Sequence, residues 1–261
     1  MSGNRDVKLI ESCRALVLLG PWLELCKFAE VPFVPAEFSE PFPVRQILAA
    51  CDPVSEDQPI VELKSAWEWY RARLDGALAA GDRVSARFEC CSCEELKNVA
   101  AQGKPWGPDY YVLSYDDPRV HDCTVGDTTR LCIRPWVEAL RYGAWPVEFR
   151  FFASGSTYAL SSYYPRRPLS KHLHEDLADA ALLLGMQLAD AMMTVGAPLV
   201  APYGFSADFI VREDGEVLFL EGGPPHVAEP PLGCPSAHPC CMEPGNIYGI
   251  AFARRKGALD H

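Results

Sequence analysis

The sequence predicts an α+β protein built from antiparallel sheet with packing helices. Its second half reads as hairpin, long helix, hairpin. Residues 146–153 (PVEFRFFA) alternate apolar and polar side chains, and residues 157–164 (TYALSSYY) return after a Ser-Gly-Ser turn. Residues 169–195 place apolar side chains at helical spacing. Residues 207–211 and 216–221 are core-like strands joined by Asp-Gly, a strong turn signal, so sheet and helix alternate in one fold.

The first half of the chain is less regular. We expect helical pieces within residues 1–30, and extended or turning chain over residues 31–59, where prolines recur. Apolar spacing predicts a helix over residues 61–80 that ends at Gly81. Further short elements are predicted at residues 84–89, 94–101, 110–115 and 130–137. The expected organisation is an N-terminal helical and proline-rich region (1–80), a small lobe (81–137) and a C-terminal lobe with an irregular tail (138–261).

Composition restricts the function. The formal net charge of −11 and pI near 5.0 oppose broad nucleic-acid binding, because an acidic chain repels phosphate backbones. Eleven cysteines in no regular framework favour a reducing, cytoplasmic compartment. We see no run of about 18 apolar residues, so no membrane span is expected. Pro21 and Glu24 interrupt the apolar stretch 15–25, and no clear cleavage site follows it, so we expect no signal peptide.

Two carboxylates in the second hairpin are the candidate metal ligands. Asp208 lies near the start of the first strand and Glu221 at the end of the second, 13 residues later. A tight turn brings the two strand ends together, about 5 Å apart. Paired carboxylates repel each other unless a cation lies between them, and Mg²⁺ prefers such hard oxygen ligands. The alternative is a pair of solvated charges, but the apolar strands around them weaken it.

The segment 207–225 (ADFIVREDGEVLFLEGGPP) resembles the ATP-grasp metal motif, in which Asp and Glu-x-Asn-Pro stand at this spacing. Three further segments resemble the divergent ATP-grasp clade that contains the cell-division-cycle-123 translation-factor chaperone. They are residues 131–138 (LCIRPWVE), 148–152 (EFRFF) and 159–164 (ALSSYY). The resemblance covers about residues 84–225. It implies an ATP-grasp-like fold with the nucleotide between two lobes, and ATP and Mg²⁺ as cofactors.

The resemblance also implies roles for single residues. Asp208 and Glu221 would hold Mg²⁺. Arg87 matches a basic residue near the nucleotide phosphates, and its fork suits them. Arg150 would meet the terminal phosphate and act in catalysis. Glu148 is a further nucleotide-binding candidate. Because side chains alternate along a strand, it points the same way as Arg150, and the mutual pairing of the two residues is the alternative.

Three more residues match the segment that links the lobes. Arg134 and Trp136 lie where backbone groups usually bind adenine; Arg134 reaching a phosphate and Trp136 packing in the core are alternatives. Glu138 would bind a ribose hydroxyl, with a solvated charge as its alternative. Gly223 departs from the motif, because it stands where the family has an Asn ligand. A metal ion would lose that ligand, or water would replace it.

The resemblance implies an ATP-dependent carboxylate–amine ligase that modifies a peptide or protein. Its alternative is an ATP-binding assembly chaperone for a protein partner such as a translation factor, without turnover. The third hypothesis is a degenerate family member that binds a nucleotide, which the glycine at position 223 makes possible. The Cys234, His238, Cys240 and Cys241 group lacks a second ligand pair at zinc-finger spacing, and its role stays open.

Overall fold

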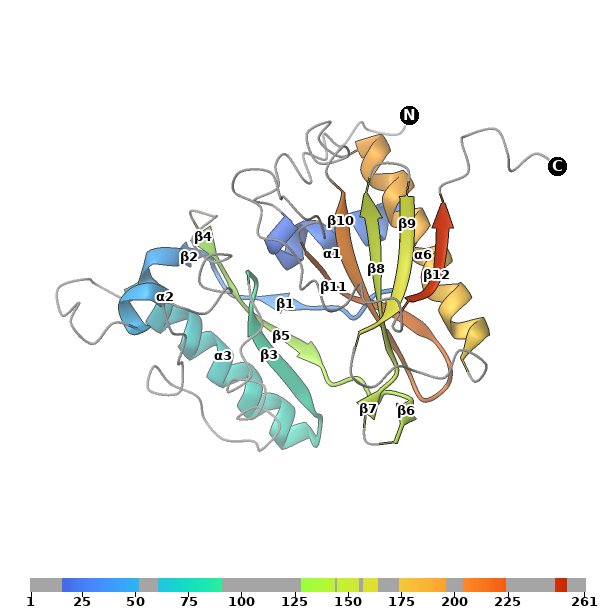
Figure 1. Cartoon of the computed structure of the whole chain (residues 1–261). Helices are drawn as coiled ribbons and strands as arrows, with labels where there is room; N and C mark the ends of the chain where they lie inside the picture. The colour runs from blue at the N-terminus through green and yellow to red at the C-terminus, as the bar shows by residue number, and fades with distance from the viewer. Residues whose placement is uncertain are drawn as a thin grey trace, which may run out of the picture. The chain divides into compact units, whose positions relative to one another are not determined.

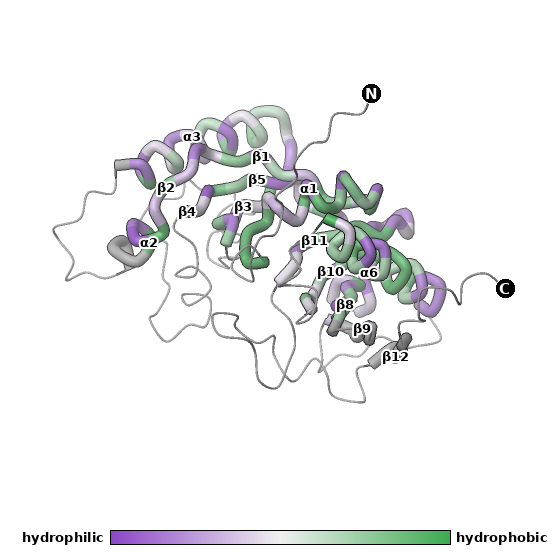
Figure 2. Tube along the Cα trace, turned by 90° about the horizontal axis from the view of Figure 1, so that it is seen from above, coloured by the Kyte–Doolittle hydropathy of each residue, from purple (hydrophilic) through white to green (hydrophobic). Residues whose placement is uncertain are grey.

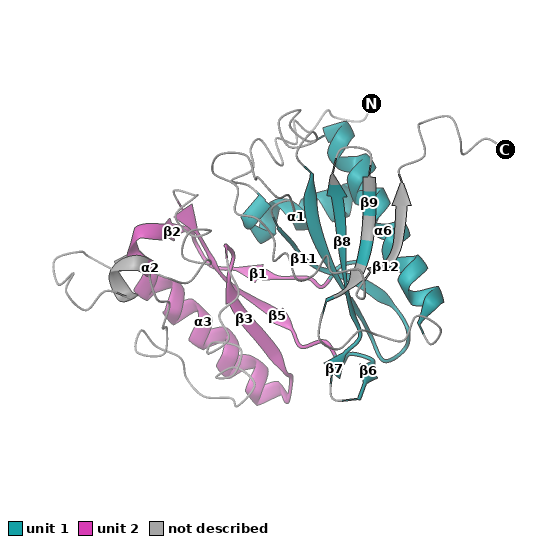
Figure 3. Cartoon of the chain, in the orientation of Figure 1, with its two compact units in different colours: residues 1–33, 138–261 teal, residues 34–137 magenta. Residues whose placement is uncertain are grey.

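The computed structural model describes residues 16–51, 61–90, 128–143, 145–154, 157–163, 174–195, 204–223 and 247–252. The chain divides into two compact units (Figure 3). Unit 1 comprises residues 1–33 and 138–261, and unit 2 comprises residues 34–137. The predicted N-terminal region 1–80 is thus shared between the two units, and helix α3 (Val61–Ala80) lies in the same unit as residues 81–137.

Unit 1 contains a five-stranded sheet in the order β11-β10-β8-β9-β12, antiparallel throughout (Figure 1). Among the described residues of this unit, two helices and a short β6–β7 hairpin accompany the sheet. The elements are α1 (Leu19–Ala29), β6 (Arg141–Tyr142), β7 (Trp145–Pro146), β8 (Glu148–Ser154), β9 (Thr157–Ser162), α6 (Glu175–Val195), β10 (Phe205–Val211), β11 (Val217–Gly223) and β12 (Ile247–Phe252).

Both predicted hairpins are present. Asp214 and Gly215 form the turn between β10 and β11, and Gly215 has φ +88°, which glycine adopts without steric strain. The Asp214 carboxylate accepts a hydrogen bond from the Glu216 N–H at 3.1 Å, which closes the turn. β8 and β9 form the first hairpin. Pro146, however, belongs to β7, so the predicted start of that strand was two residues early.

Helices α1 and α6 contact the strands of this sheet and bury its apolar face. Trp22 on α1 lies against Phe205 and Phe219, at ring-centroid distances of 5.2 and 5.7 Å. A Cβ on Gly222 would overlap the Trp22 ring, and one on Gly185 of α6 would overlap the Phe151 ring. Glycine is therefore required at both positions for close packing.

By length and composition alone, α6 is long and apolar enough to cross a membrane, contrary to our expectation that no segment is. Its hydrophobic and hydrophilic residues alternate along the helix (Figure 2). Ala181, Leu188 and Met192 are buried, and the helix contacts β8, β9 and α1. These contacts are those of a core helix, so composition is weak evidence for a span here.

Unit 2 contains a three-stranded antiparallel sheet, β1-β5-β3, and a two-stranded β2–β4 ladder. Helix α3 contacts β5 and β2, and its Tyr70 is fully buried. Phe42 and Phe88 add to this core, with ring centroids 6.1 Å apart. The elements are β1 (Glu37–Phe38), β2 (Phe42–Pro43), α2 (Val44–Cys51), α3 (Val61–Ala80), β3 (Val84–Phe88), β4 (Thr128–Thr129) and β5 (Leu131–Pro135).

Three other expectations need correction. Helix α2 lies inside the supposedly non-helical stretch 31–59, because Pro43 and Pro53 flank it without entering it. Helix α6 begins at Glu175 rather than Leu169, with the His174 carbonyl accepting the first hydrogen bond from Ala178 N–H at 2.9 Å. Strand β12 was not predicted. The predicted elements at 94–101 and 110–115, and the Cys/His group of the tail, lie outside the described residues.

Candidate functional site

A polar face on the unit 1 sheet brings together most of the site residues predicted there. Asp208 and Glu221 are direct partners in the β10–β11 ladder, as their spacing predicts, and an irregularity in the ladder follows Asp208. Asp208 also pairs with Arg150 across β10–β8. Side chains alternate along a strand, so these polar groups lie opposite the face that α1 and α6 cover.

Arg150 binds Asp208 with two charge-assisted hydrogen bonds. Its Nε–H and one terminal N–H donate to the two carboxylate oxygens, each at 2.6 Å. Only 3% of the Asp208 side chain and 14% of the Arg150 side chain are exposed. A carboxylate buried to this extent needs such a partner. The pairing of Glu148 with Arg150, which we considered as an alternative, stays a prediction.

Tyr163 completes this group, and the sequence analysis did not identify it. The Arg150 guanidinium lies over the Tyr163 ring, 4.6 Å from its centroid. The Tyr163 backbone N–H donates to the Glu148 carbonyl at 2.9 Å. Burial raises the pKa of the Tyr163 hydroxyl, and the carboxylates of Asp208 and Glu221 raise it further. The hydroxyl therefore stays protonated and remains a hydrogen-bond donor beside these carboxylates.

Glu148 and Ser206 are also buried polar residues of these strands, each 5% exposed. Ser206 lies two residues before Asp208 on β10 and pairs directly with Gly223 on β11. A Cβ on Gly223 would lie 3.2 Å from the Ser206 Oγ. The serine hydroxyl thus stands beside the place that a side chain at position 223 would take.

Unit 2 has its own polar face, on strands β3 and β5. Arg87 pairs with Cys132 in the ladder, and the neighbouring Arg134 pairs with Ser85. Both arginines are buried, at 9% and 3% exposed. Arg134 donates to the backbone carbonyls of Val34 at 2.6 Å and Pro35 at 3.4 Å. Its position is therefore fixed by backbone acceptors within unit 2.

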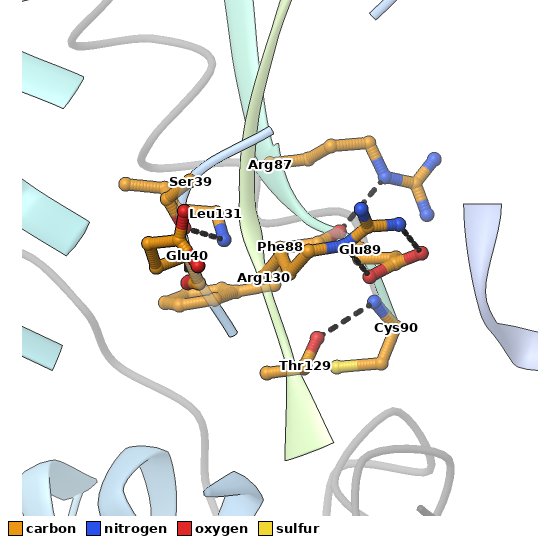
Figure 4. Close-up of polar contacts among 9 residues, drawn as sticks. All are labelled: Ser39, Glu40, Arg87, Phe88, Glu89, Cys90, Thr129, Arg130 and Leu131. Atoms are coloured by element: carbon orange, nitrogen blue, oxygen red, sulfur yellow. Dashed lines mark hydrogen bonds and ion pairs between the residues drawn. The ribbon is translucent and has the colours of Figure 1, made fainter. Parts of the chain in front are cut away.

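A second bidentate ion pair lies on the same face (Figure 4). Arg130 donates to both oxygens of the buried Glu89 at 2.7 Å, and its guanidinium lies 3.9 Å from the centre of the Phe38 ring. The Arg87 Nε–H donates to the Phe88 carbonyl at 3.0 Å. This face is rich in guanidinium groups.

The pKa of the Cys132 thiol depends on its burial and on the charged side chains around it. Burial raises its pKa to about 11, and the nearby Arg87 and Arg134 guanidinium groups oppose that rise. Three arginines and one glutamate thus surround a thiol that is neutral at physiological pH. A positive face of this kind suits an anion.

The remaining two predicted residues are Trp136 and Glu138, which lie on either side of the sequence boundary between unit 2 and unit 1. Trp136 is partly exposed, and the Arg83 guanidinium lies 4.9 Å from its ring centroid. Glu138 is exposed, and its backbone carbonyl accepts a hydrogen bond from the Glu213 N–H at 3.1 Å. Neither position tests the predicted contact with adenine or ribose.

The donor set of unit 1 fits a hard divalent cation in chemical type, with paired carboxylates and an adjacent hydroxyl. Among the described residues, no three His, Cys, Asp or Glu side chains form a metal-binding group. The carboxylate pair at 208 and 221 would supply part of a ligand set, which Mg²⁺ commonly completes with water and phosphate oxygens.

Sequence reasoning missed Tyr163, Ser206, Glu89 and Arg130. The signal for Tyr163 was its place two residues beyond Ser161, which pairs with Arg150. The signal for Ser206 was its i, i+2 spacing to Asp208. Glu89 and Arg130 are 41 residues apart, and nothing local in the sequence joins them.

No family model and no curated protein matches the chain. Among solved structures, it is similar to Cdc123 from Schizosaccharomyces pombe, with 14% identity and a TM-score of 0.45, covering 82% of this chain and 85% of that one. N5-carboxyaminoimidazole ribonucleotide synthetase from Thermotoga maritima gives 11% identity and a TM-score of 0.43, covering 85% of this chain and 44% of that one. The macrocyclase MdnC from Microcystis aeruginosa, bound with its precursor peptide MdnA, gives 11% and 0.38, covering 82% and 53%.

The structure has the predicted α+β architecture of antiparallel sheets with packing helices, and the similarity to Cdc123 agrees with the predicted resemblance. The chain spans most of the length of Cdc123 but about half of the two larger proteins. With TM-scores below 0.5, the comparisons concern the fold and decide nothing about activity. The functional argument therefore rests on the residues of the two polar faces.

Proposed function

We propose that this protein binds ATP with Mg²⁺ and is an ATP-dependent carboxylate–amine ligase that modifies a peptide or protein. The observation that carries the proposal is the direct pairing of the buried Asp208 with the half-buried Glu221, at the ATP-grasp motif spacing. Two carboxylates at adjacent ladder positions favour a divalent cation between them.

The residues divide the work by charge. Asp208 and Glu221 would hold Mg²⁺, which neutralises phosphate charge when bound. Arg87 and Arg134 on unit 2 supply guanidinium groups of the kind that bind phosphate. Arg150 has two donors on Asp208, so Mg²⁺ and Arg150 compete for the same carboxylate. Weakening that pair would make the guanidinium available to a terminal phosphate.

The reaction class comes from the sequence resemblance. A substrate carboxylate takes the γ-phosphoryl group of ATP, giving ADP and an acyl phosphate. An amine then displaces phosphate and forms an amide. Arg150 is the candidate catalytic residue, because a fixed positive charge stabilises negative charge on the phosphoryl group in transfer.

Gly223 favours a second candidate, an ATP-binding assembly chaperone for a protein partner. A glycine where the family has Asn leaves one fewer side-chain ligand, which harms turnover more than binding. ATP consumption that depends on an added peptide carboxylate supports the ligase. Nucleotide binding with a stable protein complex, and no such consumption, supports the chaperone.

The test is calorimetric titration of ATP with Mg²⁺ into the wild type and the Asp208→Asn, Glu221→Gln and Glu216→Gln variants. Glu216 is on the same hairpin but exposed, where it pairs with Arg212, and serves as the matched control. We expect micromolar binding in the wild type and in Glu216→Gln, and binding weakened about tenfold or more in the other two variants. An absence of binding by folded wild type contradicts the proposal.

A further inference from the structure

The end of the β10–β11 hairpin has a hydroxyl where the metal motif lacks a side chain. Ser206 and Gly223 are direct partners in the ladder, two positions beyond the pairing of Asp208 with Glu221. Gly223 has no side chain to fill its place, and a Cβ there would come within 3.2 Å of the Ser206 Oγ. The serine Oγ therefore borders the space that an Asn side chain would start to enter.

The direction and burial of Ser206 suit a ligand. Ser206 and Asp208 are two residues apart on β10, so their side chains leave the same face of the sheet. Ser206 is 5% exposed and Asp208 is 2% exposed. A hydroxyl beside two carboxylates adds a neutral oxygen, a donor type that Mg²⁺ accepts from Ser and Thr in other nucleotide sites.

We propose that the Ser206 hydroxyl is the third protein ligand of the metal ion, in place of the side chain absent at Gly223. The proposal rests on the proposed function, because it assumes that Asp208 and Glu221 hold a cation. It adds that the oxygen comes from the partner strand of the hairpin, at the cross-strand position. Gly223 leaves the space, and Ser206 supplies the oxygen.

The first test measures metal affinity directly. Mn²⁺ is titrated into the full chain with saturating AMPPNP, and free Mn²⁺ is followed by electron paramagnetic resonance. We expect Ser206→Ala to weaken Mn²⁺ binding about tenfold, or about 1.4 kcal/mol. Ser206→Thr keeps the hydroxyl and should retain affinity. In the Ser206→Ala background, Gly223→Asn should restore it, because Gly223 does not require a positive φ.

The second test separates a ligand from a structural hydroxyl. Ser206→Cys replaces oxygen by sulfur, which prefers soft cations. We expect this variant to lose Mg²⁺-dependent AMPPNP binding and to regain binding with Cd²⁺, whereas the wild type should show no such preference for Cd²⁺. A structural serine gives no switch of metal, and Cd²⁺ rescue remains measurable if Ser206→Ala fails to fold.

The failures are distinguishable. If the wild type binds Mn²⁺ with AMPPNP and both Ser206→Ala and Ser206→Cys bind equally well, the role of Ser206 is wrong and the proposed function stands. If folded wild type binds neither, the proposed function itself is wrong, and the role of Ser206 with it.

Discussion

The two units each carry a bidentate arginine–carboxylate pair on the polar face of an antiparallel sheet, but in surroundings of opposite charge. In unit 1, Arg150 holds Asp208, and the residue opposite Asp208 in the ladder is another carboxylate, Glu221. In unit 2, Arg130 holds Glu89 among further arginines. An ion pair of the same geometry thus sits in an acidic setting that suits a cation and in a basic setting that suits an anion.

The arginines of the two pairs also differ in their exposure to solvent. The carboxylates are equally buried, at 3% for Asp208 and 5% for Glu89, but Arg150 is 14% exposed and Arg130 is 32% exposed. Each guanidinium also lies over an aromatic ring, Tyr163 in unit 1 and Phe38 in unit 2. Removing the carboxylate should therefore cost more stability in unit 1, because the charge of Arg150 has less access to water than the charge of Arg130.

The largest effect is expected from removing the carboxylate charge in unit 1. Asp208→Asn should lower the free energy of unfolding by about 3–5 kcal/mol, because it removes the carboxylate charge of a buried ion pair with Arg150. Glu89→Gln should cost less, about 2 kcal/mol, since Arg130 stays partly hydrated. Urea denaturation measures both, with the exposed Glu216→Gln as a control below about 1 kcal/mol. A larger loss for Glu89→Gln contradicts the ranking.

The thiol of unit 2 should give a pH dependence. Burial raises the pKa of Cys132 from 9.0 to about 11, so the folded state holds this proton more tightly than the unfolded state. Its contribution to stability is present below pH 9 and is lost as the pH rises through about 11, amounting to about 2–3 kcal/mol. Between pH 8 and pH 11, the free energy of unfolding should fall more steeply for the wild type than for Cys132→Ala. Parallel curves would show that the thiol is not responsible.

Nucleotide binding should separate the two polar faces by their dependence on metal. Glu221→Gln should weaken binding of ATP about tenfold with Mg²⁺ present and leave binding in EDTA unchanged. Arg87→Met should weaken binding about tenfold under both conditions, because guanidinium and phosphate attract each other without a metal. Calorimetry in the two buffers measures this. The same metal dependence in both variants would refute the division of roles.

The smallest effect concerns the aromatic rings under the arginines. A double-mutant cycle of Tyr163→Leu with Arg150→Met should give a coupling of about 1 kcal/mol in stability. The corresponding cycle of Phe38→Leu with Arg130→Met should give about 0.5 kcal/mol, since Arg130 is more exposed. Tyr163→Phe, which keeps the ring, is the control for the first cycle. Equal couplings would mean that exposure does not set this interaction.

Local pattern was sufficient for both hairpins and for helix α3. Asp214–Gly215 fixes the turn, and the turn brings the ends of the two strands together, as the sequence predicted. The direct pairing of Asp208 with Glu221 also needs the irregularity between Asp208 and Phe209, because the register next to the turn would place Asp208 opposite Leu220. Helix α3 ends where Gly81 adopts φ +79°. Helix α2 was missed because proline content described the whole segment, while the prolines lie only at its flanks.

The sequence by itself determined the hairpins, the helix stripes and the pair of carboxylates, because turns and periodicity act over a few residues. Only the tertiary structure decided that Arg150 binds Asp208, which is 58 residues away, and that Arg130 binds Glu89. It also decided that Ser206 borders the space at Gly223. Such contacts depend on which strands become neighbours, and strand order results from burying the apolar faces of whole sheets against helices rather than from any local signal.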